Sequence, residues 1–166
     1  MTDNLRESKL SAVERENKFL TFALGAEEFG IAILKVREII GMMPITPIPR
    51  TPNYLKGIIN LRGKVIPVAD LRLKFKMDAM EPTDHTCIIV VEVTGANGLV
   101  PVGIVVDSVS EVLNIKKEDI EDISSLGEAG LDIEFITGMA KTEGGVKILM
   151  DIDRALGGQD YDNLTA

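Results

Sequence analysis

The sequence predicts an all-β protein with a few short helices, built as two five-stranded β-barrel subdomains that share one hydrophobic core. Three observations predict this class. The chain contains 19 Ile and 14 Val against 16 Leu, and its only aromatic residues are five Phe and two Tyr. Its apolar runs have the length of strands, and part of its pattern occurs twice. Because β-branched side chains suit a pleated sheet and lose rotamer freedom in helices, this composition favours strands.

Eight apolar runs are bounded by turn residues and are therefore predicted strands. They cover residues 18–24, 29–33, 57–61, 64–68, 87–93, 99–106, 135–140 and 146–152. Glycines at 25, 63, 95, 98, 144 and 145 supply the turns. Between residues 41 and 52 four prolines fix the backbone and remove hydrogen-bond donors, which predicts an extended connector outside the centre of a sheet.

Three short helices are predicted. The run 34–40 has room for two turns before Gly41 and the prolines. In the run 107–113, Ser108 and Glu111 have the spacing of a capping box. A last helix begins near Ile152 and ends at the glycine pair 157–158.

A weak internal duplication divides the chain. Two blocks recur with constant offsets, the first of 73 residues (Gly30 with Gly103, Val36 with Val109, Glu38 with Glu111) and the second of 81 (Gly57 with Gly138, Gly63 with Gly144, Asp70 with Asp151). We therefore expect one domain over 18–157 with β subdomains at 28–80 and 85–152, and polar tails at 1–17 and 158–166. Each repeated aspartate is interpreted as a helix cap rather than a catalytic acid.

The composition excludes several classes of site. One His and one Cys cannot supply a structural zinc site or a disulfide framework, so neither a metal nor a cofactor is expected. A net charge of -8 disfavours nucleic-acid binding. No apolar run reaches about 18 residues, so neither a membrane-spanning segment nor a signal peptide is expected and the protein is predicted to be cytosolic.

Two further candidates for function stand in the sequence. His85 and Cys87 fall on one side of an extended strand, which leaves a small Cys/His enzyme as an alternative, although nothing nearby lowers the thiol pKa. Arg62 lies at the tip of a hairpin between two almost wholly apolar strands. A turn arginine is usually only solvated, but a guanidinium on a rigid hairpin can also bind a carboxylate through its fork.

Residues 48–72 read IPRTPNYLKGIINLRGKVIPVADLR, which resembles the signature of the CheW family of bacterial chemotaxis coupling proteins. The resemblance extends from residue 19 to 156 and includes FGIAILKVREI and VGIVVDSVSEVL. It implies two five-stranded SH3-like barrels and a non-catalytic scaffold without a cofactor. Such proteins couple the cytoplasmic tips of transmembrane chemoreceptors to the regulatory domain of a histidine kinase. The implied location is the cytoplasmic face of the membrane, at receptor arrays, with no insertion into the membrane.

Carried onto this sequence, the receptor-binding groove of the family implies a set of six residues. They are Val36 and Glu38 on the first short helix, Gly57 and Arg62 around the first hairpin, and Val109 and Val112 on the second short helix. The three valines could equally be core residues. Kinase contacts would use exposed aliphatic side chains, of which Leu126 is a guess. A Cys/His enzyme and a nucleic-acid-binding barrel remain the alternatives, the latter without the stacking aromatics it needs.

Overall fold

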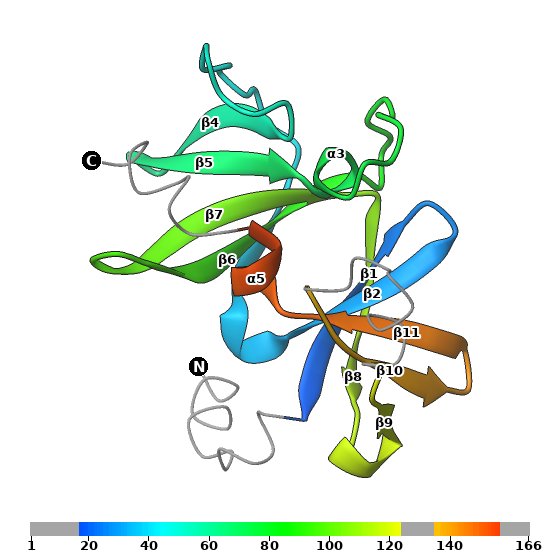
Figure 1. Ribbon diagram of the computed structural model, residues 1–166. Coiled ribbons are helices and arrows are strands. Elements are labelled where there is room, and N and C mark those ends of the chain that lie inside the picture. The colour runs from blue at the N-terminus through cyan, green and yellow to red at the C-terminus, as the bar shows by residue number, and fades with distance from the viewer. Residues whose placement is uncertain (1–16, 124–134, 157–166) are drawn as a thin grey trace, which may run out of the picture.

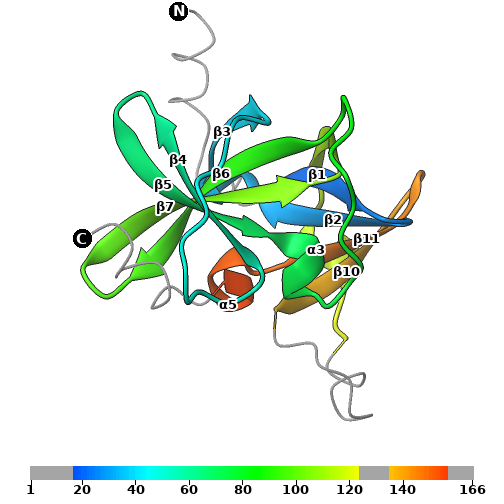
Figure 2. The ribbon, with the colours of Figure 1, turned by 90° about the horizontal axis from the view of Figure 1, so that it is seen from above.

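The structure is a computed structural model that describes residues 17–123 and 135–156. Two twisted sheets lie beside each other, with short helices where they meet (Figures 1 and 2). This arrangement confirms the predicted all-β class. Within the two described ranges, no helix is long and apolar enough to cross a membrane.

The first sheet has six strands in the order β8-β1-β2-β11-β10-β9. Their bounds are β1 Lys18–Leu24, β2 Glu27–Ala32, β8 Ser108–Asn114, β9 Ile120–Glu121, β10 Ile136–Thr142 and β11 Gly145–Met150. All neighbours in it are antiparallel except β2 and β11, which are parallel. We call it sheet A.

The second sheet, sheet B, has five strands in the order β3-β6-β7-β5-β4. Their bounds are β3 Val36–Gly41, β4 Leu55–Leu61, β5 Lys64–Asp70, β6 Cys87–Gly95 and β7 Gly98–Val106. Its single parallel pair joins β5 to β7. The connector after β3 returns to this sheet, because Thr46 and Ile58 exchange two backbone hydrogen bonds of 2.9 Å.

The two sheets do not divide the chain at the predicted boundary between residues 80 and 85. Hairpin β1–β2 comes from the first repeat but lies in sheet A between β8 and β11, whereas hairpin β6–β7 of the second repeat lies in sheet B between β3 and β5. The duplication is therefore visible in the topology, but the subdomains 28–80 and 85–152 are replaced by sheets that exchange hairpins. Sequence periodicity detects the repeat and carries no signal for which half a hairpin joins.

The repeated glycines Gly30 and Gly103 allow this exchange. A Cβ atom on Gly30 would lie 2.9 Å from Leu149 Cδ2, and one on Gly103 would lie 2.8 Å from Ile88 Cγ2 and 3.4 Å from Val68 Cγ2. Leu149 and Val68 are the parallel partners of these two glycines. Each glycine thus gives the space that a hairpin needs to lie against a strand of the other repeat.

Two of the three predicted helices are wrong. In the predicted helix 34–40, the first two residues belong to the 3-10 turn η1 (Ile33–Lys35) and the rest belong to β3. In the predicted helix 107–113, all residues after the first belong to β8. Burial along β3 alternates between half-buried and exposed residues, as expected for a strand. Ser108 and Glu111 form no capping box, because Thr21 Oγ1 of the neighbouring β1 accepts from Glu111 N at 3.1 Å and donates to Glu111 O at 2.9 Å.

The helix caps are confirmed. Asp70 begins helix α3 (Leu71–Lys74), and its Oδ1 accepts from the backbone N–H of Arg72 at 2.9 Å. Asp151 precedes helix α5 (Ile152–Leu156), and its Oδ1 accepts from the N–H of Asp153 at 2.9 Å. Both carboxylates satisfy a donor that the first turn of a helix leaves without a partner.

The predicted shared core is also confirmed. The largest cluster of buried side chains contains residues of both sheets, from Phe22 and Ile31 in sheet A to Ile89 and Val102 in sheet B. A smaller cluster lies in sheet B alone, and another around β10 and β11 of sheet A. The many Ile and Val residues thus contribute to one hydrophobic cluster that joins the two sheets and to two smaller clusters, one in each sheet.

Four of the five phenylalanines form a row through the shared core. Adjacent ring centroids are 5.9 Å apart for Phe22 and Phe29, 5.8 Å for Phe29 and Phe75, and 4.3 Å for Phe75 and Phe135. Phe75 follows α3 and Phe135 precedes β10, so the row connects segments that are distant in sequence. The few large rings are concentrated where the sheets meet.

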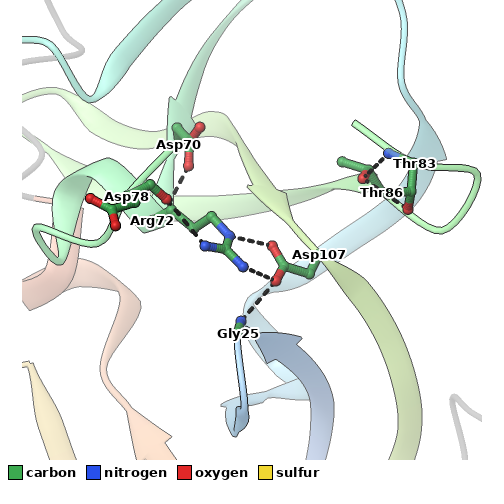
Figure 3. A network of polar contacts seen from close by, with 7 residues as sticks. All are labelled: Gly25, Asp70, Arg72, Asp78, Thr83, Thr86 and Asp107. Carbon is green, nitrogen blue, oxygen red and sulfur yellow. Dashed lines mark hydrogen bonds and ion pairs between the residues drawn. The ribbon is translucent and has the colours of Figure 1, made fainter. Parts of the chain in front are cut away.

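A group of polar contacts fastens the sheets at one place (Figure 3). Arg72 donates from Nε and Nη2 to the two carboxylate oxygens of Asp107 at 2.7 and 2.6 Å, and Asp107 also accepts from the N–H of Gly25 at 2.7 Å. Asp107 is the single residue between β7 of sheet B and β8 of sheet A, and Gly25 lies in the turn of β1–β2. We call these three residues the Arg72 seam.

Acid is expected to weaken the Arg72 seam. The hydrogen bonds from Arg72 lower the pKa of Asp107 below its ordinary value of 3.8, against the effect of burial. A carboxylate with a lowered folded-state pKa contributes stability above its ordinary pKa and loses this contribution as the pH falls through the folded value. The free energy of unfolding, measured with urea, should therefore decrease below about pH 4, and Asp107→Asn should make this decrease shallower. An unchanged slope in that variant would contradict the expectation.

Candidate functional site

The tip of hairpin β4–β5 holds Arg62 in a rigid setting. Arg62 and Gly63 form a two-residue loop in which both φ angles are positive, at 52° and 85°. Such loops match the twist of the strands that they connect. Asn60 Oδ1 accepts from the backbone N–H of Gly63 at 2.9 Å and closes the turn. The position of the arginine is therefore fixed at its backbone while its side chain remains 69% exposed.

Glu38 meets Arg62 from the other edge of sheet B. It lies on the edge strand β3, and its Oε2 forms an ion pair with Arg62 Nη2. The glutamate is the more covered partner, with 27% of its side chain exposed. The structure thus brings together the two charged residues of the predicted set, from strands at opposite edges of one sheet.

A hollow of about 230 Å³ lies between these two residues and the end of the sheet. Its lining consists of Arg37, Glu38, Leu61, Arg62, Lys64, Ile66 and Val90. Its lining carries three cations and one carboxylate in a protein of net charge -8, and one of the cations, Arg37, also forms an ion pair of 4.0 Å with Glu92 outside the lining. Because an arginine fork carries five N–H donors, Arg62 can bind Glu38 and still present donors to an acidic or carbonyl group of a partner.

The three valines of the predicted set have different surroundings, and all lie on strands rather than on the expected helices. Val36 and Val109 are half-buried and pack against the shared core. Val112 on β8 is 51% exposed. The first two therefore have a core role, whereas Val112 offers an apolar surface to a partner.

Gly57 has a structural role that the sequence did not reveal. Its φ is +143°, and a Cβ atom there would lie 2.0 Å from the carbonyl oxygen of Thr46. The close approach that the glycine permits is thus made by the chain's own connector. Gly57 is buried in β4, the first strand of the hairpin that has Arg62 at its tip. It therefore affects the site through the position of this strand.

The equivalent position in sheet A has the opposite charge. There a hollow of about 610 Å³ is lined by Glu111, Asp119, Lys141 and Glu143 among others. The offsets of the duplication align Glu111 with Glu38 and Glu143 with Arg62. Sheet A therefore places two acids where sheet B places an ion pair, and the basic hollow distinguishes one end of the molecule.

The geometry does not favour the Cys/His alternative. Burial raises the pKa of the Cys87 thiol, which disfavours the nucleophilic thiolate. His85 is exposed in the loop before β6, and its backbone N–H donates to Thr83 Oγ1 at 3.1 Å. Among the residues that the structure describes, no three His, Cys, Asp or Glu are placed to hold a metal ion.

Other residues of the hollow were missed by the sequence analysis. Arg37 and Lys64 contribute two of its three cations. Lys64 follows the Arg62-Gly63 turn directly, so its place beside Arg62 could have been predicted from the hairpin. Arg37 could not, because it was expected on a helix. Leu126, the predicted kinase contact, lies outside the described residues.

Two β-sheets that exchange hairpins around one core, with a charged hollow at the end of one sheet, give this protein a candidate binding site. Comparison with protein families matches residues 18–159 to the CheW-like domain. The chain belongs to this family, and its function is that of a chemotaxis scaffold.

Known relatives and a solved structure agree. Chemotaxis protein CheW of Klebsiella aerogenes is 39% identical over 153 residues, which cover 92% of this chain and 89% of that protein. CheW of Rhizobium meliloti is 36% identical over 136 residues, or 82% of this chain and 84% of that protein. The crystal structure of the scaffolding protein TtCheW from Thermoanaerobacter tengcongensis superposes with a TM-score of 0.76 at 34% identity, covering 88% of this chain and 97% of the other.

Proposed function

We propose that this adaptor binds the cytoplasmic tip of chemoreceptors through the hollow around Glu38 and Arg62, and the regulatory domain of a histidine kinase through other surfaces. It would act in the cytoplasm at receptor arrays, without catalysing a reaction. The observation that carries the proposal is the ion pair that joins an edge strand to a rigid hairpin tip.

The charge of the hollow supports a partner segment that presents acidic or carbonyl groups. Arg37, Arg62 and Lys64 line the hollow together with one glutamate, Glu38, and Arg37 also pairs with Glu92 at 4.0 Å. Complementary charge raises the association rate and fixes the register of a partner. Arginine is also enriched among the residues that dominate binding energy. Glu38, which accepts from Arg62, holds the guanidinium in the orientation that the partner would meet.

The kinase contact is assigned to exposed aliphatic side chains. Apart from Val112 of the receptor-binding set, large exposed hydrophobic residues in the described ranges include Leu34, Ile39, Val65, Leu99 and Val146. Leu34 lies on η1 and the others lie on strands of both sheets, so they offer surfaces to more than one partner. Leu126 stays a prediction.

Charge reversal at Arg62 tests the proposal. Arg62→Glu should reduce co-sedimentation with receptor-bearing membranes at least about tenfold, because a charge-assisted hydrogen bond contributes about 1.5–3 kcal/mol and about 1.4 kcal/mol equals a factor of ten. Far-UV circular dichroism should be unchanged, because the side chain is 69% exposed.

Lys141→Glu is the matched control. Like Arg62, Lys141 lies near the turn of a hairpin and pairs with a glutamate, Glu121, at 2.7 Å. Unlike Arg62, it lies in sheet A. This control should sediment like the wild type, and so should the double variant His85→Ala/Cys87→Ala in assays with receptor and kinase. Full binding by Arg62→Glu would reject the site, and loss of coupling in the double variant would revive the enzyme hypothesis.

A further inference from the structure

A second seam between the sheets repeats the plan of the Arg72 seam. Lys35 Nζ donates to Asp153 Oδ2 at 2.9 Å, and Asp153 Oδ1 accepts from the backbone N–H of Thr94 at 2.7 Å. Lys35 ends η1, between β2 of sheet A and β3 of sheet B, and Asp153 lies on α5. We call Lys35, Asp153 and Thr94 the Lys35 seam.

The helix residues of the two seams are equivalent in the duplication, but the charges of the seams are exchanged. Arg72 and Asp153 are separated by 81 residues, the offset of the second block, and each lies on the short helix after the last strand of its repeat. The cation is on the helix in one seam and at the strand junction in the other. In both seams the carboxylate accepts at 2.7 Å from a backbone N–H of the exchanged hairpin.

The Arg72 seam makes more contacts and is less exposed. Its arginine and aspartate form two parallel hydrogen bonds, and their side chains are 15% and 17% exposed. Lys35 and Asp153 form one bond, with 36% and 28% exposed. A bidentate arginine pair is stronger and more directional than a lysine pair, and solvent screens exposed pairs more.

The open hollows beside the two seams also differ in size. The hollow at the Arg72 seam measures about 50 Å³, whereas the hollow at the Lys35 seam measures about 340 Å³. The positions are equivalent: Asp70 and Arg72 line the first, and their counterparts Asp151 and Asp153 line the second. Apolar side chains line much of the larger hollow, namely Phe19, Ile31, Ala32, Met150 and Ile152. Asp153 therefore borders a larger open hollow than Arg72 and Asp107 do.

We infer that the sheets are joined by one tight and one loose seam, so that they move relative to each other about the Arg72 seam while the Lys35 seam opens. Arg72 and Asp107 are then positioning residues for β8, which begins immediately after Asp107. Lys35 immediately precedes β3, the strand that carries Glu38. The loose seam is therefore next to the strand that carries the ion pair, and the tight seam is next to β8 with Val112.

Hydrogen exchange of two amides tests this directly on the protein alone. The N–H groups of Gly25 and Thr94 donate to the carboxylates of the two seams at the same distance, 2.7 Å. Their protection factors, measured by NMR and corrected for intrinsic rates, report how often each seam opens. We expect Thr94 to be at least about tenfold less protected than Gly25. Equal protection, or stronger protection of Thr94, would overturn the inference.

Two variants identify the cause of the difference. Arg72→Met should lower the protection of Gly25 toward that of Thr94, and Lys35→Met should change Thr94 by less than about threefold, because that seam already opens. The buried amide of Ile89 is the internal reference for global unfolding. A larger effect of Lys35→Met than of Arg72→Met would overturn the assignment of the tight seam. Both readouts are independent of receptor binding, so they stand or fall separately from the proposed function.

Discussion

Gly57→Ala is expected to destabilise the protein by at least about 4 kcal/mol, a large part of the stability of a domain of this size. Two effects add. A residue with a side chain rarely adopts a φ of +143°, and the new Cβ atom would lie 2.0 Å from the Thr46 carbonyl oxygen and 2.9 Å from Pro47 Cα. Both neighbours are backbone atoms, so no side-chain rotation relieves the overlap. Urea denaturation monitored by circular dichroism measures the loss.

Gly63→Ala separates these two effects. Gly63 also has a positive φ, +85°, but no atom lies within 4 Å of the position that its Cβ would take. This variant should cost only about 1–2 kcal/mol from backbone strain. Equal losses of stability in Gly57→Ala and Gly63→Ala would contradict the close approach of the connector to Gly57.

Phe29→Ala is expected to cost about 3–5 kcal/mol. Phe29 is 7% exposed and lies in the middle of the phenylalanine row, with Phe22 on one side and Phe75 on the other. Truncation would leave a cavity in the core that both sheets share and would remove two ring contacts. The thermal midpoint and the urea midpoint should both fall.

Leu99→Ala is the control for loss of a large apolar side chain. Leu99 is 62% exposed at the end of hairpin β6–β7, so its truncation should change the free energy of unfolding by less than about 0.5 kcal/mol. Phe29→Leu, which keeps most of the buried volume, should lie between the two. A loss below about 1 kcal/mol for Phe29→Ala would show that the row adds little to the core.

The strands could be predicted from sequence because their signal is local. Apolar runs bounded by turn residues identify β1, β2, β4 to β7, β10 and β11, and the repeated aspartates identify the caps of α3 and α5. Strands β3 and β8 were mistaken for helices, because seven residues fit two helical turns as well as one strand. These segments become strands because β3 pairs with β6 and β8 pairs with β1, and both partners are distant in sequence.

The candidate site divides in the same way. The rigid hairpin under Arg62 follows from its apolar strands and its Arg-Gly turn, and the structure adds the ion pair between Arg62 and Glu38. The role of Gly57 could not be found from the sequence, since it depends on where the connector returns. The cationic contribution of Arg37 was hidden by the wrong helix. Residues are predictable where neighbours in sequence determine their surroundings.

The exchanged hairpins also determine what can fold. A cut in the segment between α3 and β6 would leave an N-terminal piece with hairpin β1–β2 but without β8 and β11, and with β3 and β5 but without the hairpin between them. The C-terminal piece would have the complementary defects. The molecule therefore corresponds to a domain-swapped dimer whose two halves are joined in one chain. The linker keeps each half at a high effective concentration relative to the other. We therefore expect the pair of repeats to be the smallest unit that folds cooperatively.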